Sequence, residues 1–408
     1  MRQGERYVIV GGGIAGVTAA ETLRTEGFDG EIVVIDGDEN LPYDRPPLSK
    51  ELLINNQTNE ESLQLREPSF YADNKIYLEL GKFVKDIDVI DRKVVLEDGR
   101  SITWDKILLT TGSTPRSFYV KGASLPGVHY LKDLNSALSL RNTLTKIDRI
   151  VIIGAGFIGL EVAAACRKLG IDVTIIELMP TPLAHVVGTE VGNFLTDFHK
   201  SQGVKIITED KVKEIRGSLQ ATEVITESGH HFPCDAVLVS IGVNAENSLI
   251  KDPRFGSRIT VNDYGETDIP GVFAAGDCAY WNYFIEGSQI RVEHWDHAIN
   301  HGKVVAKNMV RPAVEKYRVI PYFWSDHYEE KLQYIGHPLK WDSTVMRGSF
   351  NDNKFTIFFI RNERVVGALA WNDSASLLPT RRLIERQEIV NIGDLSDTNK
   401  KLRKLVSK

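Results

Sequence analysis

The fold is decided by a glycine-rich stretch, Gly11-Gly12-Gly13-Ile14-Ala15-Gly16, which follows an apolar run from Tyr7 to Val10. An alanine-rich segment, Val17 to Arg24, comes next, and a second apolar run, Glu31 to Ile35, ends in Asp36. This order predicts a strand, a tight turn, a helix and a second strand, which is the right-handed crossover of a parallel sheet. The glycines let the backbone turn and approach a pyrophosphate, while the helix N-terminus offers unpaired N–H groups to the phosphates. The terminal acid can accept hydrogen bonds from ribose hydroxyls.

The same order of features occurs a second time. An apolar run from Arg149 to Ile153 leads into Gly154-Ala155-Gly156-Phe157-Ile158-Gly159, a helix is expected through Lys168, and the run Asp172 to Ile176 ends in Glu177. One such turn can be a glycine-rich loop without a ligand, but two complete copies predict two dinucleotide sites. The candidate residues are Gly11, Gly13, Ala15, Gly16 and Asp36 in the first copy, and Gly154, Gly156, Phe157, Ile158, Gly159 and Glu177 in the second.

Length and composition exclude several classes of protein. The 408 residues suggest two or three domains, and 42% hydrophobic with 25% charged residues is ordinary globular usage. The net charge of −6 argues against a nucleic-acid binder. Three scattered cysteines fit a reducing cytoplasm better than a disulfide framework or a zinc site. No apolar run approaches the ~18 residues of a membrane span, and the strand expected from Tyr7 leaves no room for a signal peptide. We therefore expect a soluble cytoplasmic protein that binds neither nucleic acid nor membrane.

Two further segments complete the first dinucleotide site. Lys106 to Ser113 predicts a buried strand that runs into a small-residue turn containing Thr111 and Gly112. Thr267 to Asp277 predicts a strand that delivers an aspartate just after a glycine, where the acid can accept a hydrogen bond from a ribityl hydroxyl. With the glycine turn, these segments resemble the flavoproteins that have two dinucleotide domains. In that family the first site holds FAD and the second, inserted site holds NAD(P)H.

The resemblance implies an α/β fold with two Rossmann-like dinucleotide-binding domains in the three-layer arrangement of glutathione reductase, followed by a C-terminal α+β domain. The FAD-binding domain would be discontinuous, formed by 1–114 and 245–320. The NAD-binding domain would be inserted as 115–244, and the C-terminal domain would span 321–408.

The second site favours NADH over NADPH. The carboxylate of Glu177, at the end of the second strand, would repel a 2′-phosphate, and 178–182 contains no Arg or Lys that could accept one. His185 is the nearest possible cation, and it is a poor one at pH 7.

A longer signature is Leu41-Pro42-Tyr43-Asp44-Arg45-Pro46-Pro47-Leu48-Ser49-Lys50. It resembles the ferredoxin reductases of bacterial oxygenase systems, of the putidaredoxin reductase and biphenyl dioxygenase reductase types, with apoptosis-inducing factor as a more distant relative. The resemblance also covers Gly159–Glu161, Ser240–Val243, Arg291–Trp295 and Tyr322–Asp326. It implies that Lys50 lies beside the isoalloxazine ring and pairs with Glu161 next to the nicotinamide. Further cofactor contacts are implied at Arg45, Pro46, Val84, Lys132, Gly242 and Trp295.

Lys50 and Glu161 are the candidate catalytic residues. The two prolines before Lys50 order its loop, and a lysine held there can favour a negatively charged reduced flavin. The alternative is a surface lysine and a first-turn acid that stabilises the helix dipole. At Trp295 we favour flavin contact over simple packing. No metal is expected, because three neighbouring histidines are interpreted as a polar helix edge: His294, His297 and His301.

The cysteines predict how electrons leave the flavin. Disulfide reductases of this superfamily carry a cysteine pair within 40–55, and this chain has no cysteine there. Cys166, Cys234 and Cys278 are expected to be buried packing residues. We therefore expect NADH to reduce FAD, and FAD to pass electrons to a [2Fe–2S] ferredoxin that serves an oxygenase or cytochrome P450. The alternatives are a rubredoxin reductase, a peroxide-forming NADH oxidase, and a redox-sensing interaction protein like apoptosis-inducing factor.

The C-terminal tail is basic although the chain as a whole is acidic. From Ser376 onward it carries eight Lys and Arg residues against four Asp and Glu residues. Such a face could steer an acidic ferredoxin towards the protein, and a solvated helical tail explains the charges equally well. The sequence is compatible with a monomer or a dimer.

Overall fold

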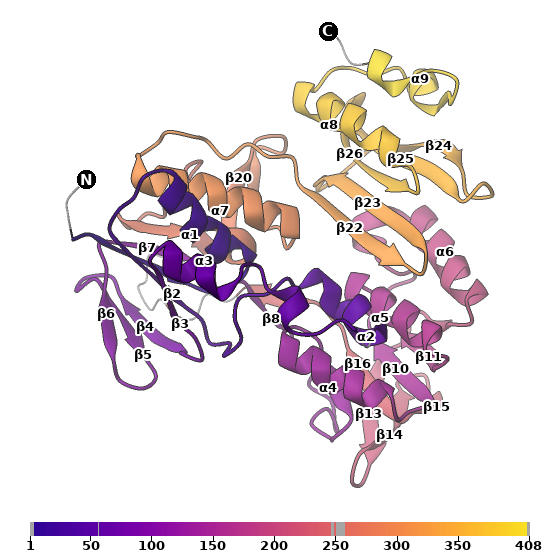
Figure 1. Cartoon of the computed structure of the whole chain (residues 1–408). Helices are drawn as coiled ribbons and strands as arrows, with labels where there is room; N and C mark the ends of the chain where they lie inside the picture. Colours follow the sequence, from indigo (N-terminus) through magenta and orange to yellow (C-terminus); the bar gives the residue numbers. More distant parts are fainter. Residues whose placement is uncertain (1–3, 56, 246–248, 250–257, 406–408) are drawn as a thin grey trace.

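The computed structural model describes residues 4–55, 57–245, 249 and 258–405. Within these residues the three largest sheets have five strands each, and each forms the centre of one part of the molecule (Figure 1). The part that contains β1 lies on the left of the view, the part that contains β10 at the lower right, and the C-terminal part at the upper right.

The first part is built on a parallel sheet in the order β19-β7-β1-β2-β3. Its strands are short apolar runs, and the central ones are buried on both faces, as parallel sheets require. Alternate side chains of β1 and β2 point to opposite faces, towards helices α1 and α7 on one side and towards a small antiparallel sheet on the other. These three layers comprise β1 (Arg6–Val10), β2 (Glu31–Ile35), β3 (Ile76–Glu79), β7 (Lys106–Leu109), β19 (Val272–Ala274), α1 (Ile14–Thr25), α7 (Trp295–Val310), β4 (Val84–Asp88), β5 (Lys93–Leu96) and β6 (Ser101–Thr103).

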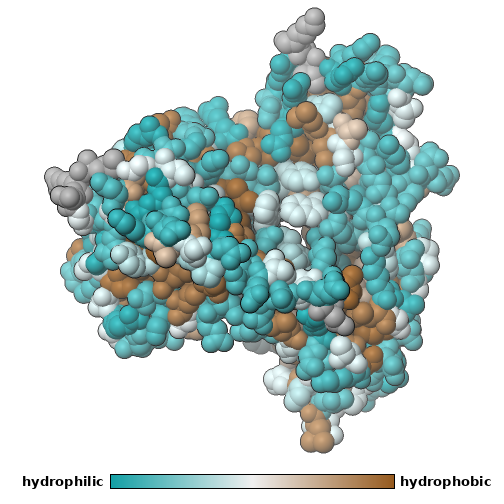
Figure 2. All heavy atoms as spheres, in the orientation of Figure 1, coloured by the Kyte–Doolittle hydropathy of each residue, from teal (hydrophilic) through white to brown (hydrophobic). Residues whose placement is uncertain are grey.

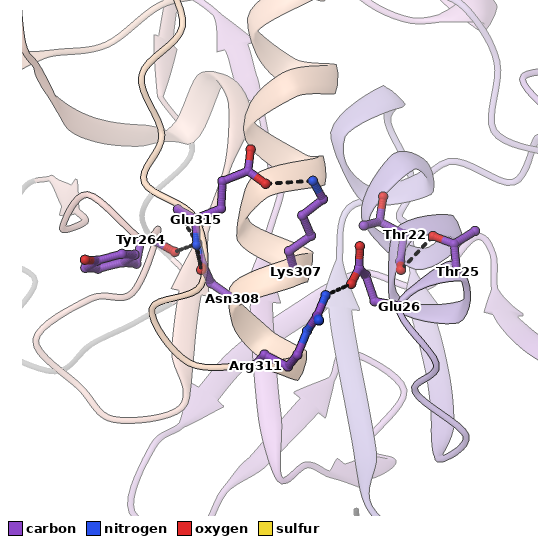
Figure 3. Close-up of polar contacts among 8 residues, drawn as sticks. All are labelled: Thr22, Thr25, Glu26, Tyr264, Lys307, Asn308, Arg311 and Glu315. Atoms are coloured by element: carbon purple, nitrogen blue, oxygen red, sulfur yellow. Dashed lines mark hydrogen bonds and ion pairs between the residues drawn. The ribbon is translucent and has the colours of Figure 1, made fainter.

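Helices α1 and α7 pack closely although residues 26–294 lie between them in sequence (Figure 1). A Cβ atom on Gly302 would lie 2.5 Å from the carbonyl oxygen of Ala15, so only glycine permits this approach. At the end of the pair, Arg311 forms an ion pair with Glu26 (Figure 3). The helix contact thereby holds the N-terminus of α1, which carries the first glycine turn.

The second part repeats this architecture with a parallel sheet in the order β12-β11-β10-β16-β9. Side chains of β10 alternate between the layer that contains α5 and the layer that contains a second small antiparallel sheet. The elements are β9 (Val128–Tyr130), α4 (Leu134–Leu144), β10 (Arg149–Ile153), α5 (Phe157–Lys168), β11 (Asp172–Ile176), α6 (Ala184–Ser201), β12 (Lys205–Ile207), β13 (Val212–Gly217), β14 (Ala221–Thr226), β15 (His231–Pro233) and β16 (Ala236–Val239).

Two adjacent strands connect the first part to the second. β8 (Ser113–Pro115) pairs in antiparallel register with β17 (Val243–Ala245), so the chain enters and leaves the second part side by side. These strands fall where we predict the NAD-binding domain, 115–244, to begin and end. The predicted limits remain a prediction, and the portions of the three domains at 1–3, 246–248, 250–257 and 406–408 lie outside the described residues.

The C-terminal part is an antiparallel sheet in the order β22-β23-β26-β25-β24, followed by helices α8 and α9. Strand β22 lies at the edge of this sheet and contacts both α5 and α7. The elements are β22 (Tyr322–His327), β23 (Glu330–Gly336), β24 (Ser343–Ser349), β25 (Lys354–Arg361), β26 (Arg364–Trp371), α8 (Leu377–Arg386) and α9 (Ile392–Ser396). The predicted fold class, two Rossmann-like domains with a C-terminal α+β domain, is therefore confirmed.

Smaller elements fill the connections: α2 (Glu51–Ile54), α3 (Pro68–Asp73), β18 (Ile259–Thr260), β20 (Ala279–Tyr283) and β21 (Ser288–Ile290). Throughout the described part of the chain, each helix is too short or too polar to span a bilayer.

Candidate active site

The first glycine turn has the geometry of a phosphate-binding loop. Gly11 adopts a φ of 112°, and a Cβ there would lie 2.2 Å from the carbonyl oxygen of Thr110. A Cβ on Gly16 would lie 2.1 Å from the carbonyl oxygen of Gly11, so this glycine lets α1 pack against the end of β1. In contrast, a Cβ on Gly13 would meet no protein atom within 4 Å. The backbone at Gly13 is therefore open to a ligand at the N-terminus of α1.

The second turn repeats these distances. Gly154 has a φ of 100°, and its Cβ would lie 2.3 Å from the carbonyl oxygen of Ser240. A Cβ on Gly159 would lie 2.3 Å from the carbonyl oxygen of Gly154, whereas the nearest atom to a Cβ on Gly156 is 3.9 Å away. Both turns thus combine two sterically required glycines with one open glycine, which fits a pyrophosphate at each helix N-terminus.

An acid stands at the same place beside each turn. The carboxylate of Asp36 accepts a hydrogen bond from the backbone N–H of Gly12 at 2.6 Å, and that of Glu177 accepts one from Ala155 at 2.6 Å. The second oxygen of Glu177 accepts the N–H of Met179 at 2.8 Å. These bonds fix the carboxylates at the carboxyl ends of β2 and β11, where a nucleotide ribose lies in this architecture.

Three chain segments meet beside the first turn. Lys132 Nζ donates a hydrogen bond to Ser113 Oγ at 2.9 Å, and Ser113 donates to Asp277 at 3.3 Å. Gly112, between the predicted residue Thr111 and Ser113, has a φ of 72° and open space where a Cβ would be. Burial, assisted by the positive charge of Arg45, lowers the pKa of Lys132 to about 8. The site thus offers an anionic group at Asp277 and a cationic one at Lys132.

A cavity of about 310 Å³ lies where the three parts of the molecule meet. The surface is hollowed there, with hydrophobic residues along the border of the hollow (Figure 2). Predicted residues that line the cavity are Arg45, Pro46, Lys50, Lys132, Phe157, Ile158, Glu161, Asp277 and Trp295. Predicted residues outside its lining are the glycines of both turns, Ala15, Asp36, Val84, Thr111, Gly112, Glu177 and Gly242.

Two of these outlying residues have other surroundings. Val84, at the start of β4, belongs to the hydrophobic core that also contains Val33 and Ile35 of β2. Gly242 follows β16 with a φ of 92°, and the nearest atom to a Cβ there would be the Nε atom of Arg116 at 3.7 Å. Neither observation assigns a cofactor contact, so both assignments stay predictions.

A cluster of charged side chains lies at the cavity. Lys50 Nζ lies 3.4 Å from a carboxylate oxygen of Glu161 and 3.0 Å from one of Asp326. Glu161 is only 7% exposed, and it also accepts hydrogen bonds from the hydroxyls of Ser49 at 2.5 Å and Ser325 at 2.7 Å. Residues from all three parts of the molecule therefore converge on one buried ion pair.

Burial and the neighbouring charged groups shift the pKa values of Lys50 and Glu161 in opposite directions. Burial alone would lower the pKa of Lys50, but Glu161 and Asp326 outweigh it and raise that pKa above its usual value. Burial raises the pKa of Glu161, and Lys50 with the two serine hydroxyls opposes this rise. The ammonium is thus firmly charged, whereas the charge of Glu161 depends on its three hydrogen-bonding neighbours.

Aromatic side chains form one wall of the cavity. Trp295, the first residue of α7, donates its indole N–H to Asp44 at 2.6 Å and packs edge-on against Trp324, with ring centres 5.7 Å apart. Lys50 Nζ lies 5.5 Å from the centre of the Trp324 ring. Trp295 is therefore fixed at the cavity by a hydrogen bond, rather than serving only as a packing residue.

The predicted polar helix edge is wrong. His297 and His301 of α7 are completely buried, because they pack among Trp281 and Tyr317. His297 shares a hydrogen bond of 2.8 Å with the Tyr317 hydroxyl. The described residues contain no cluster of three or more His, Cys, Asp or Glu residues that could hold a metal ion.

All three cysteines are free and buried: Cys166, Cys234 and Cys278. Burial raises the pKa of the Cys166 and Cys234 thiols to about 12 and also raises that of Cys278. Since thiolates are the reactive form, these residues have the properties of packing residues, as predicted.

Four side chains that line the cavity or contact its ion pair were missed from the sequence: Ser49, Trp324, Ser325 and Asp326. Each lies within a stretch that resembles the reductase family, and that resemblance was the one signal available for them. Hydroxyls and single carboxylates carry no spacing pattern of their own, so their contacts with Glu161 and Lys50 were not predictable from the chain alone.

Comparison with known proteins agrees with this architecture. Residues 5–302 match the family model described as pyridine nucleotide-disulphide oxidoreductase, and residues 322–406 match the reductase C-terminal domain. Rhodocoxin reductase of Rhodococcus erythropolis is 35% identical over 404 residues, covering 98% of this chain and 94% of its own. Human apoptosis-inducing factor 3 is 32% identical over 94% of this chain, which corresponds to 64% of its own length.

A solved structure agrees equally well. The crystal structure of the covalent putidaredoxin reductase–putidaredoxin complex contains a chain that superimposes with a TM-score of 0.94, at 30% identity and 99% coverage of both chains. This family uses FAD and NAD(P)H, in agreement with the predicted FAD and pyridine nucleotide; the preference for NADH remains a prediction. With its two glycine turns, shared cavity and third domain, the chain therefore belongs to the pyridine nucleotide-disulphide oxidoreductases, as an FAD-dependent member that carries the reductase C-terminal domain.

Proposed function

We propose that the chain is an NADH-dependent flavoprotein reductase that passes electrons from NADH through FAD to a [2Fe–2S] ferredoxin, which in turn serves an oxygenase or cytochrome P450. The observation that carries this proposal is the buried Lys50–Glu161 pair, which lies in a cavity shared by both dinucleotide-binding parts. No nucleophile or general acid is needed for hydride transfer between two bound ring systems, since positioning and exclusion of water suffice.

The first part has the groups that FAD requires. The open backbone at Gly13 suits the pyrophosphate, and Asp36 suits a ribose. Asp277 would supply an acceptor for a ribityl hydroxyl, and Lys132 would supply a cation for a phosphate. FAD, once bound, supplies the acceptor of the hydride and the donor of single electrons. Lys50 lines the cavity and would be a cation beside this ring system.

The second part has the groups that NADH requires. Glu177 is held beside the turn of α5 by two backbone N–H groups, which leaves a carboxylate where a 2′-phosphate would have to lie. Glu161 follows on the same helix and lines the cavity, so its carboxylate can accept a hydrogen bond from a carboxamide N–H. This arrangement supports NADH over NADPH.

Electrons leave the flavin directly under this proposal. Cys166, Cys234 and Cys278 are buried and free, so none is placed to relay electrons to the surface. In the solved structure named above, a related reductase is covalently joined to putidaredoxin. The basic residues of α8 would attract an acidic ferredoxin. We place the protein in the cytoplasm, as a monomer or dimer that size-exclusion chromatography would distinguish.

The test is the electron acceptor of the purified protein. NADH should bleach the bound flavin, and cytochrome c reduction should require an added [2Fe–2S] ferredoxin. Equal turnover with rubredoxin would indicate a rubredoxin reductase, and stoichiometric peroxide without any carrier would indicate an oxidase. Very slow turnover, with a long-lived complex of reduced protein and NAD⁺ and a changed oligomeric state, would indicate a redox-sensing interaction protein instead.

A further inference from the structure

Strand β22 approaches the ion pair in an unusual way. Consecutive residues of a strand point to opposite faces, and Ser325 is accordingly buried while the side chain of Asp326 is 32% exposed. Both side chains nevertheless reach the same pair, Ser325 through Glu161 and Asp326 through Lys50. This is possible because β22 is an edge strand, so a group beyond its free edge can be reached from both faces.

We propose that Ser325 and Asp326 are positioning residues, through which the C-terminal domain sets the charge and orientation of the Lys50–Glu161 pair and so completes the nicotinamide side of the active site. This inference rests on the function proposed above. Neither residue is proposed to touch a reacting atom: Ser325 acts through Glu161, and Asp326 acts through Lys50.

The role of Ser325 follows from the hydrogen bonds of Glu161. Its two carboxylate oxygens each accept one hydroxyl, Ser325 at 2.7 Å and Ser49 at 2.5 Å. A buried carboxylate without such donors takes up a proton, because burial penalises the charged form. Ser325 therefore helps to keep Glu161 ionised, and an ionised oxygen is the better acceptor for a carboxamide N–H.

The role of Asp326 follows from the position of the Lys50 ammonium between two carboxylates. The ammonium lies closer to Asp326, at 3.0 Å, than to Glu161, at 3.4 Å. Asp326 in turn lies 3.8 Å from the exposed Lys331. Two carboxylates from different domains therefore divide the charge of Lys50, and Asp326 decides how much of that charge faces the cavity.

The C-terminal domain is also joined to the second part of the molecule by contacts that do not involve Ser325 or Asp326. On the same side of the molecule, Lys168 of α5 forms an ion pair with Glu329 at 2.7 Å and donates to the carbonyl of Tyr328 at 3.1 Å. This exposed pair joins the same two parts outside the cavity. Further along β22, His327 bonds to His199 of α6, and both imidazoles are neutral because burial lowers their pKa. The charged groups that face Glu161 are therefore Lys50 and, behind it, Asp326.

The experiment measures NAD⁺ binding to the FAD-loaded protein from pH 5 to pH 8. A carboxylate that loses a hydroxyl donor has a higher pKa, so in Ser325→Ala the acid limb of the binding curve should move up by about one to two pH units. Ser325→Thr, which keeps the hydroxyl, should restore the wild-type curve. Ser49→Ala removes the donor on the other oxygen and should shift the curve in the same direction.

The effect of Asp326→Asn is measured as a change in the midpoint potential of the bound flavin, which is determined by titration in the presence of redox dyes. Removal of one anion beside Lys50 leaves more positive charge facing the ring, so the potential should become more positive, and Asp326→Glu should return it towards wild type. Glu329→Gln is the matched control, because it breaks a contact between the same domains outside the cavity and should change neither measurement.

Unchanged curves and potentials in folded, FAD-loaded variants overturn the inference, even if thermal unfolding temperatures fall. Shifts of equal size in Glu329→Gln would also overturn it, since they would reflect domain docking alone. A wild-type protein that binds no FAD or is not reduced by NADH contradicts the proposed function as well, so the two failures are distinguishable.

Discussion

Lys132 brings a positive charge into the buried part of the FAD side of the cavity. Its neighbours there are Arg45, which lowers its pKa further after burial, and the acids Asp277, Glu293 and Asp133, which oppose this effect. The resulting pKa of about 8 belongs to the protein without a phosphate beside Lys132. A pyrophosphate beside Lys132, as in the proposed FAD site, would favour the ammonium form, so FAD binding above pH 8 should be coupled to proton uptake.

We therefore expect FAD affinity to be constant below pH 8 and to fall by up to about tenfold per pH unit above it. Lys132→Arg, which stays charged, should remove this dependence. Dilution of each FAD-loaded protein at pH values from 7 to 10, followed by the fluorescence of the released flavin, measures the FAD affinity of the wild type and of the variant. An equal slope for the two proteins would mean that another group titrates.

Glu177 provides a second prediction at this scale. Glu177→Ala removes the acceptor of two backbone N–H groups beside the second turn and the expected ribose contact. NADH binding should weaken by about 10- to 100-fold, while the absorption spectrum of bound FAD should not change. Stopped-flow reduction of the flavin over a range of NADH concentrations gives the affinity. Loss of the flavin would contradict the assignment of the two sites.

Residues with local signatures were predictable, and residues with distant partners were not. Gly11, Gly16 and Asp36 are defined by the short spacing of the glycine turn, and their sterics follow from that spacing. Ser325 meets Glu161 across 164 positions of sequence. Such a contact depends on how two domains dock, which no local pattern in the chain encodes.

Near its C-terminus, helix α7 is tied to the neighbouring loops by one buried amide. Asn308 is 1% exposed, and its side chain donates to the carbonyls of Tyr264 at 3.1 Å and Glu315 at 2.7 Å and accepts the N–H of Glu315 at 3.0 Å (Figure 3). Asn308→Ala leaves these backbone groups without partners inside the protein. We expect a loss of about 2–4 kcal/mol in the free energy of unfolding, measured by urea denaturation.

A neighbouring ion pair supplies the control for this measurement. Lys307 lies 2.6 Å from Glu315, and the carboxylate is exposed (Figure 3). Glu315→Gln keeps the backbone contacts of Asn308 and should therefore cost less than about 1 kcal/mol. If both variants lose the same stability, the buried amide has no special role in anchoring the C-terminal end of α7.

Strands and helices with a simple hydrophobic pattern in the sequence were predicted well. The strands β1, β2, β10 and β11 are continuous apolar runs, because helices or a second sheet cover both of their faces. The interpretation failed for α7, whose histidines suggested an exposed edge. Each imidazole is instead accommodated inside by specific partners, as His297 is by Tyr317, and hydrophobic patterning does not detect such partners.

For the molecule as a whole, we expect its buried neutral histidines to lower the free energy of unfolding in acid. His199 and His327 join the NAD-binding and C-terminal domains by a hydrogen bond of 3.0 Å, and burial lowers the pKa of His199 to about 3. The unfolded chain takes up a proton at this residue near pH 6.5, whereas the folded chain does so only near pH 3. Stability should therefore fall as the pH drops below 6.5, by about 3 kcal/mol at pH 4 for His199 alone.

His199→Gln tests this directly, because glutamine retains hydrogen-bonding groups but does not titrate. Between pH 6.5 and pH 4 the variant should take up about one proton fewer on unfolding than the wild type. Denaturation curves at several pH values give this number from the slope of the free energy of unfolding. Parallel slopes would mean that His199 is protonated in the folded protein.

The two Rossmann-like folds were predictable because the glycine turn occurs twice in the sequence. The limits of the domains remain a prediction, and the β8–β17 pair lies close to the predicted start and end of the inserted part. What the repeat could not indicate is how the third part docks. Its edge strand β22 reaches a buried charge through residues that also suit an ordinary antiparallel sheet.

The convergence of Lys50, Glu161 and β22 has a practical consequence for redesign. Exchanging the third domain between related reductases is an obvious way to alter their choice of electron acceptor. In this chain such a graft would also replace two residues that contact the Lys50–Glu161 pair. A chimera that retains a serine and an aspartate at 325 and 326 should keep its flavin chemistry, whereas one that lacks them would change partner and redox behaviour at once.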